Sequence, residues 1–271
     1  MRPGRLVARI VAGAAIGAVA AFLLLPLVAL VLQVRPASLA AELSQPAVLD
    51  ALRLSLLSSV AATSVVVVLG MPVALLLAAR DFRGKRILET LVALPMVLPP
   101  TVAGLALLLA FGRAGLLGGT LSLIGITVPF TTLAVVMAQV FVALPFFIGA
   151  ATAGFRGVDR SYVEVAATLR ASRPYTTARI LIPLSLPSLS AGAAMGWARA
   201  LGEFGATITF AGNVPGVTQT MPLAVYLRLE TDFEAAVALA LLLLAVSFGV
   251  LLAVGAGPFA LGRARAAGAP R

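Results

Sequence analysis

The sequence contains no cysteine and no histidine among its 271 residues. Their absence excludes disulfides, thiolate nucleophiles, metal sites built from cysteine or histidine, and acid–base chemistry by imidazole. Charged residues are scarce, at 11% of the chain against about 25% in an ordinary soluble domain. Hydrophobic residues make up 61%, and the mean hydropathy is +1.09. We therefore expect an all-α membrane protein that buries its apolar surface in lipid.

Long apolar runs divide the chain into candidate membrane helices. A bilayer core needs about 20 mostly apolar residues, and six runs reach that length, at residues 10–34, 54–79, 87–111, 131–155, 180–205 and 235–258. The first run is longer than the apolar part of a signal peptide, and no clear small-x-small cleavage site precedes Arg35. We therefore predict six transmembrane helices, the first of them uncleaved.

The net charge of +10 is distributed in short clusters between these runs, which is typical of membrane topology and not of a nucleic-acid-binding face. One side receives fifteen basic residues: Arg2, Arg5, Arg9, Arg80, Arg83, Lys85, Arg86, Arg156, Arg160, Arg170, Arg173, Arg179, Arg263, Arg265 and Arg271. The other side receives four: Arg35, Arg53, Arg113 and Arg228. This bias predicts that the first side is cytoplasmic, with both termini there, in a bacterial or archaeal inner membrane.

Three regions follow from this topology. Residues 1–50 hold the N-terminal tip, the first helix and an outer loop, residues 51–258 form a core of five helices, and residues 259–271 form a short basic tail. Three prolines, Pro95, Pro99 and Pro100, interrupt the third span and favour a broken helix that lines a path.

The cytoplasmic segment 156–182 is long enough to fold, and its sequence predicts two short helices with a break. Asp159 is a possible N-cap of the first, and Ser161 with Glu164 fits a capping box as an alternative. Ser172 is a possible N-cap of the second, with Pro174 in its first turn. The first helix carries an apolar stripe of Tyr162, Val165, Ala166 and Leu169. Such a helix either docks a cytosolic partner or lies on the lipid headgroups.

This segment resembles the EAA loop of permease subunits of ABC importers, whose pattern is Glu-Ala-Ala, three residues, Gly, nine residues and Ile-x-Leu-Pro. Here the pattern is Glu164-Val165-Ala166, then Arg170, then residues 180–183. Because a left-handed turn disfavours a side chain, Arg170 in place of Gly predicts that the turn shifts to Ala171–Ser172 or that the helix is one residue longer. The resemblance implies that the ATPase-coupling residues are Glu164, Val165, Ala166, Leu169, Arg170, Ala171, Ser172 and Pro183.

The resemblance also implies the partners: two copies of a cytosolic ATP-binding subunit, a second copy of this chain, and an extracytoplasmic oxyanion-binding protein. ATP and magnesium are then expected in the partner, because Gly84-Lys85 lacks the rest of a phosphate-binding loop. The chain itself is expected to be no enzyme and to carry no cofactor and no metal.

Residues 197–213 and 218–226 closely resemble molybdate importer permeases, although the 199–205 core is shared with sulfate permeases. Tungstate has the same shape and charge as molybdate. The path residues expected from their depth and chemistry are Pro99, Pro100, Arg199, Glu203, Thr207, Thr209 and Asn213. Arg199 either attracts the oxyanion or forms an ion pair with Glu203 one helical turn away.

Three other classes remain as alternatives. An ion-coupled secondary transporter would need carboxylates at mid-depth, and Glu203 is the one candidate in the sequence. An intramembrane enzyme would need a pair of acids within the spans, which the sequence does not offer. A stand-alone channel would have no use for the docking segment.

Overall fold

The computed structural model describes residues 3–79 and 81–267, and most of these residues are helical. The long helices are α1 (Pro3–Gln33), α3 (Pro46–Ala79), α7 (Thr132–Arg156), α10 (Ile182–Leu201) and α13 (Phe233–Ala267). The shorter ones are α2 (Pro36–Leu43), α4 (Lys85–Val97), α5 (Pro100–Phe111), α6 (Gly118–Leu123), α8 (Arg160–Thr168), α9 (Arg173–Thr176), α11 (Gly205–Phe210) and α12 (Met221–Thr231). A π-helix, Thr177–Leu181, joins α9 to α10.

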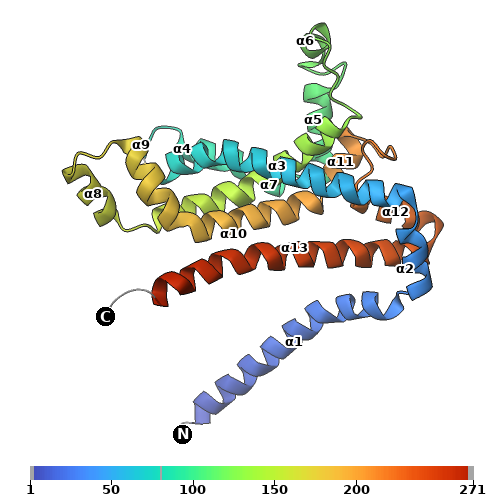
Figure 1. Cartoon of the computed structure of the whole chain (residues 1–271), viewed down its shortest axis with the longest axis horizontal. Helices are drawn as coiled ribbons and strands as arrows, with labels where there is room; N and C mark the ends of the chain where they lie inside the picture. Colours follow the sequence, from blue (N-terminus) through green and yellow to red (C-terminus); the bar gives the residue numbers. More distant parts are fainter. Residues whose placement is uncertain (1–2, 80, 268–271) are drawn as a thin grey trace.

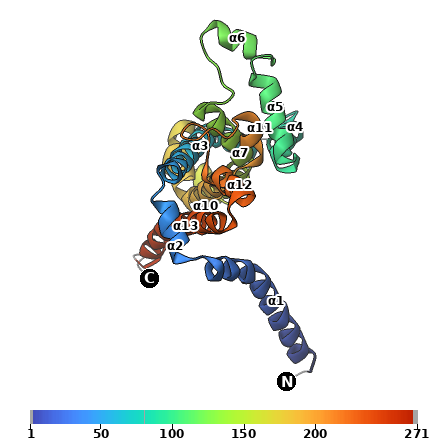
Figure 2. The same cartoon turned by 90° about the vertical axis from the view of Figure 1, so that its right-hand side faces the viewer.

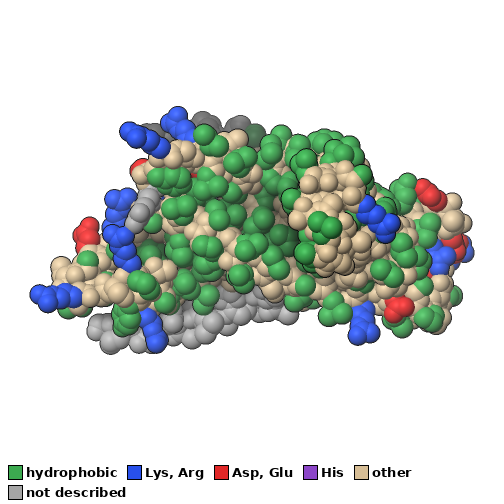
Figure 3. All heavy atoms as spheres, turned by 90° about the horizontal axis from the view of Figure 1, so that it is seen from above, with side chains coloured by type: hydrophobic (Ala, Val, Ile, Leu, Met, Phe, Trp, Pro, Cys, Tyr) green, Lys and Arg blue, Asp and Glu red, His purple; other side chains and the backbone are tan. Residues whose placement is uncertain are grey.

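The helices confirm an all-α membrane architecture. Among the described residues, five stretches are long and apolar enough to cross a membrane: Val11–Gln33, Pro46–Ala79, Thr132–Arg156, Arg173–Leu201 and Phe233–Leu252. The remaining predicted span, residues 87–111, is broken. Its two halves, α4 and α5, meet at an angle of 115° at Leu98 and Pro99, as the prolines indicated. Figure 3 shows hydrophobic side chains over the middle of the elongated body and charged side chains toward its two ends.

The core of the molecule is formed by α3, α7 and α10, which lie side by side (Figures 1 and 2). Small residues allow this close approach. A Cβ atom added to Gly70 would lie 2.7 Å from the ring of Phe147, and one added to Gly192 would lie 2.8 Å from the Cβ atom of Ala150. These glycines therefore let the three helix backbones pack closely, as small residues do in membrane bundles.

Helix α1 diverges from this body and has no buried side chain between residues 11 and 33 (Figure 1). Its apolar surface therefore remains available to lipid or to another chain.

The structure is more helical outside the predicted spans than the sequence indicated. Helix α3 begins at Pro46 and not at residue 54, because proline is favoured at the first helical position. The outer segment 206–232 contains α11 and α12, and Thr218 and Thr220 between them are fully buried. Helix α13 continues through the boundary predicted at residue 258. The division into three regions stays a prediction.

Ser55 fastens α12 to α3. Its hydroxyl accepts the backbone N–H of Met221 at 2.7 Å, and both residues are buried. Because Ser55→Ala would leave this N–H unpaired away from water, we expect the free energy of unfolding to fall by about 1–3 kcal/mol. Thermal unfolding of the purified protein measures this effect. Ser64→Ala is the control, since the Ser64 hydroxyl is exposed and bonds only within α3; an equal loss in both variants would contradict the prediction.

Candidate functional site: a docking segment and a polar helix junction

The docking segment consists of α8, α9 and the π-helix that leads into α10. Asp159 is the N-cap of α8, where its carboxylate accepts the backbone N–H of Ser161 at 2.9 Å, so Asp159 and not Ser161 begins the helix. This hydrogen bond lowers the pKa of Asp159. The cap therefore stabilises α8 fully at pH values above the ordinary aspartate pKa. This stabilisation is lost as the pH falls through the lowered pKa of Asp159. Ser172 caps α9 as predicted, by accepting the N–H of Tyr175 at 3.4 Å.

The turn after α8 corrects the prediction for Arg170. Arg170 itself adopts the left-handed conformation, with φ +58°, so the turn neither shifts to Ala171–Ser172 nor lengthens the helix. The N–H of Arg170 bonds to the carbonyl of Ala167, and the N–H of Ala171 bonds to the carbonyl of Ala166. These two bonds form a Schellman motif, which satisfies the final carbonyls of α8. The motif holds Arg170 in the left-handed conformation that glycine prefers.

We expect Arg170→Gly to stabilise this turn by about 1 kcal/mol, because glycine adopts positive φ without the steric cost that arginine bears. Hydrogen exchange measures this effect. The Ala171 amide should exchange roughly fivefold more slowly, since about 1.4 kcal/mol corresponds to a tenfold change in an equilibrium constant. Gly84→Ala, at another position with positive φ, should instead destabilise its own turn. Faster exchange of the Ala171 amide in Arg170→Gly would contradict the prediction.

The apolar stripe of α8 is not covered by the rest of the chain. Leu169 is 77% exposed, Val165 58% and Tyr162 54%, whereas Ala166 is buried against the turn. The exposed side chains border a hollow of about 970 Å³ whose far side is formed by Tyr175 and Arg179. An apolar surface with a basic rim outside the membrane core suits a protein partner.

Glu164 points to a different surface. It borders a hollow of about 640 Å³ with Lys85, Arg156 and Arg160. Arg156 at the end of α7 donates to the carbonyl of Leu77 at 3.0 Å and to the carboxylate of Glu89 at 3.1 Å. Glu164 and the apolar stripe thus occupy two faces of α8, and the face of Glu164 borders the adjoining ends of α3, α4 and α7.

A second polar region lies where α10 meets α11. The Arg199 guanidinium pairs with the Glu203 carboxylate at 2.5 Å, and Glu203 is only 1% exposed. The other oxygen of Glu203 accepts the backbone N–H of Ala206 at 2.7 Å, inside the first turn of α11. The structure therefore contains the ion pair that the sequence left as one of two alternatives, and Glu203 links the end of α10 to the first turn of α11.

Helix α5 crosses α11 at this junction in very close contact. A Cβ atom added to Gly205 would lie 2.5 Å from the Cβ atom of Pro100. One added to Gly104 would lie 2.7 Å from the carbonyl oxygen of Ala206 and 2.8 Å from the Cβ atom of Thr209. The broken span therefore packs against α11, with Pro100 beside Gly205 and Gly104 beside Thr209; that these residues line a path stays a prediction. Pro99 precedes α5 and is exposed.

The remaining predicted path residues differ in their hydrogen bonding. The Thr209 hydroxyl donates to the carbonyl of Gly205 within α11. Neither the hydroxyl of the fully buried Thr207 nor the buried side-chain oxygen of Asn213 has a partner among the described residues. Gln139 on α7, which was not predicted, is also fully buried, and both of its amide atoms lack a partner in the described part of the chain. Its position as the one amide in the apolar run 131–155 could have identified it.

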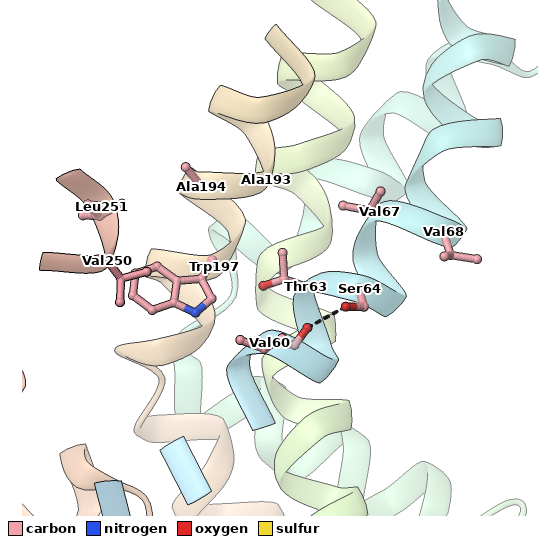
Figure 4. Close-up of a pocket in the computed structure, with 10 residues that line it drawn as sticks. All are labelled: Val60, Thr63, Ser64, Val67, Val68, Ala193, Ala194, Trp197, Val250 and Leu251. Atoms are coloured by element: carbon pink, nitrogen blue, oxygen red, sulfur yellow. Dashed lines mark hydrogen bonds between the residues drawn. The ribbon is translucent and has the colours of Figure 1, made fainter. Parts of the chain in front are cut away.

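A separate hollow of about 480 Å³ lies between α3, α10 and α13 (Figure 4). Its walls are apolar apart from Thr63, Ser64 and the indole of Trp197. Both hydroxyls donate to carbonyls of their own helix. This hollow therefore offers few donors to an anion and is better suited to a hydrocarbon chain.

Comparison with known proteins places these features in a family. Residues 67–256 match the family model described as "Binding-protein-dependent transport system inner membrane component". The chain is 46% identical, over 87% of its length and 89% of the relative, to the molybdenum transport system permease protein ModB of Mycobacterium tuberculosis. It is 36% identical, over 86% of its length and 85% of the relative, to the sulfate transport system permease protein CysT of Escherichia coli.

A solved structure has the same fold. One chain of a bacterial ABC transporter involved in the import of the acidic polysaccharide alginate superposes with a TM-score of 0.73, covering 94% of this chain and 97% of that chain at 14% identity. The family match extends over most of the described core, from the middle of α3 into α13. The chain therefore belongs to the inner membrane components of binding-protein-dependent transport systems, the permease subunits of ABC importers.

Proposed function

We propose that this chain is the permease subunit of an importer for molybdate. The observation that carries the proposal is the 46% identity to a molybdenum transport permease across 87% of the chain. The polar junction agrees with such a substrate. Its one strong positive charge, on Arg199, is already paired with Glu203, so a dianion passing here would meet mainly neutral donors. A weakly binding path suits a transporter whose affinity is supplied by a separate binding protein.

The assembly follows from the same features. The docking segment lies on the side that receives fifteen basic residues in the sequence, which supports a cytoplasmic position for α8 and for both termini. The exposed stripe of α8 then contacts a cytosolic ATPase subunit, and two copies of each subunit enclose one path. An outer oxyanion-binding protein delivers the substrate to the opposite end.

A continuous helical rod connects the docking segment with the path. Residues Arg173–Leu201 run without interruption through α9, the π-helix and α10, and α10 ends beside the Arg199–Glu203 pair. Because packed helices move as rigid units, closure of the ATPase subunits against α8 and α9 shifts the far end of α10. That shift moves α11 relative to α5 and opens or closes the path.

Uptake into proteoliposomes tests the proposal. The vesicles contain this chain, its ATPase partner and an oxyanion-binding protein, and labelled molybdate, tungstate and sulfate are compared with and without ATP. We expect ATP-dependent molybdate uptake, and its loss in Glu164→Ala. Preferred uptake of tungstate or of sulfate, the latter favoured by the 36% identity to CysT, would leave the assignment as an ATP-driven importer unchanged. It would replace molybdate as the substrate. Uptake without ATP would support a secondary transporter and overturn the proposal.

A further inference from the structure

Gln139 buries its side-chain amide without a hydrogen-bond partner among the described residues. Its side chain is fully buried in α7 between the apolar residues Ala138 and Val142, and neither Oε1 nor Nε2 has a hydrogen-bond partner among the described residues. Burying a primary amide without partners is unfavourable, and nearly all buried polar groups in folded proteins are paired. An apolar side chain of similar size would fill this position more favourably. The amide therefore points to a partner that the described residues do not supply.

The packing of α7 against α10 locates Gln139. The two helices run antiparallel, so that Gly154 approaches Ser188, Ala150 approaches Gly192, and Ala143 approaches Gly196. One further turn along each helix places Gln139 level with Ala200 at the end of α10, three residues before Glu203. The hydrophobic contacts agree, because the neighbouring Ala138 belongs to the same buried cluster as Ala206 and Phe210 of α11.

By this register, Gln139 lies at the level where α10 ends and α11 begins. The Glu203 carboxylate at this junction is occupied by Arg199 and by the N–H of Ala206. The hydroxyl of Thr207, one turn into α11, is buried and has no partner in the described part of the chain. An amide and a hydroxyl, both neutral donors, therefore lie unpaired around the same junction, close to where α5 crosses α11.

We infer that Gln139 is a specificity-determining residue of the path and that its amide N–H groups donate to a tetrahedral oxyanion when the junction opens. The inference rests on the proposed function and extends it to α7. Two N–H groups on one nitrogen can reach two oxygens of a tetrahedral anion, and Thr207 supplies a third donor. Because none of these donors is charged, the anion is selected by the geometry of its oxygens and is released again.

The test uses the complete importer in proteoliposomes and replaces Gln139 with leucine, which keeps the volume and removes the donors. We expect ATP-dependent molybdate uptake to fall by about tenfold or more, because the oxyanion would lose the hydrogen-bond donors of the amide. The preference for molybdate over sulfate in competition should also change. The thermal midpoint of unfolding should stay equal or rise, because the variant no longer buries an unpaired amide.

Thr152→Val is the matched control. Thr152 is also a buried residue of α7 whose hydroxyl has no partner within the described residues, but it lies roughly 20 Å further toward the cytoplasmic end of the helix. Its replacement should leave uptake and ion preference unchanged. Wild-type uptake and preference in Gln139→Leu would overturn the inference, as would a loss of uptake accompanied by a lower thermal midpoint. If the unaltered complex showed no ATP-dependent oxyanion uptake, the proposed function itself would fail.

Discussion

Replacing Leu169 with aspartate is expected to uncouple this permease from its ATPase without unfolding it. Leu169 is the most exposed side chain of the α8 stripe, at 77%, and it borders the hollow opposite Tyr175. A carboxylate there would have to be desolvated against the partner, and central apolar anchors of interfaces commonly contribute about 2 kcal/mol or more to binding. We therefore expect binding of the ATPase subunit to weaken by at least about tenfold and transport to fall with it.

Co-purification of the two subunits and ATP-dependent uptake measure this effect. Leu116→Asp is the control, because Leu116 is an equally exposed leucine, at 88%, that precedes α6 on the predicted outer side. It should retain its ATPase partner. Since both positions are exposed, neither substitution should change the free energy of unfolding by more than about 0.5 kcal/mol. Normal ATPase binding by Leu169→Asp would contradict the assignment of the stripe as the docking surface.

A single methyl group at Gly104 should abolish transport. The new Cβ atom would lie 2.7 Å from the carbonyl oxygen and 2.9 Å from the Cα atom of Ala206, and backbone atoms cannot turn aside as a flexible side chain can. Helix α5 would have to move away from α11, which costs about 1–3 kcal/mol in a packed core. We expect Gly104→Ala to lower the thermal midpoint and to reduce oxyanion uptake by at least about tenfold, because the broken span no longer fits the junction.

The same substitution at Gly149 provides the control. Gly149 lies inside α7, and a Cβ atom added there would meet nothing within 4 Å. Because alanine is favoured over glycine within a helix by about 0.5–1 kcal/mol, Gly149→Ala should hold or raise the thermal midpoint and leave uptake unchanged. Full activity in Gly104→Ala would show that the contact between α5 and α11 is not needed for transport.

Several features of this protein follow from its sequence alone. The six apolar runs predict the membrane helices because each is long enough to span a bilayer, and the three prolines around residue 97 predict the break between α4 and α5. The spacing from Glu164 to Pro183 carries the resemblance that predicts the docking segment. Local chemistry also placed the caps, since Ser172 bonds to a backbone N–H only three residues away.

Other features did not follow from the sequence pattern, because they depend on backbone hydrogen bonding or on contacts between distant residues. Arg170 keeps the left-handed turn that its side chain disfavours, because two backbone hydrogen bonds of the Schellman motif hold it there. The fit of Pro100 against Gly205 depends on the angle at which α5 leaves α4.

Gln139 illustrates the same limit. Its amide is visible in the sequence as one polar residue in an apolar run, but its burial without a hydrogen-bond partner is determined by how α7 packs against the neighbouring helices. The sequence by itself determined that this chain crosses the membrane and where one span breaks, because these properties depend on hydrophobicity and on the positions of prolines. Only the tertiary structure decided which polar groups gather at the junction of α10 and α11, because that depends on how closely the small residues let the helices approach.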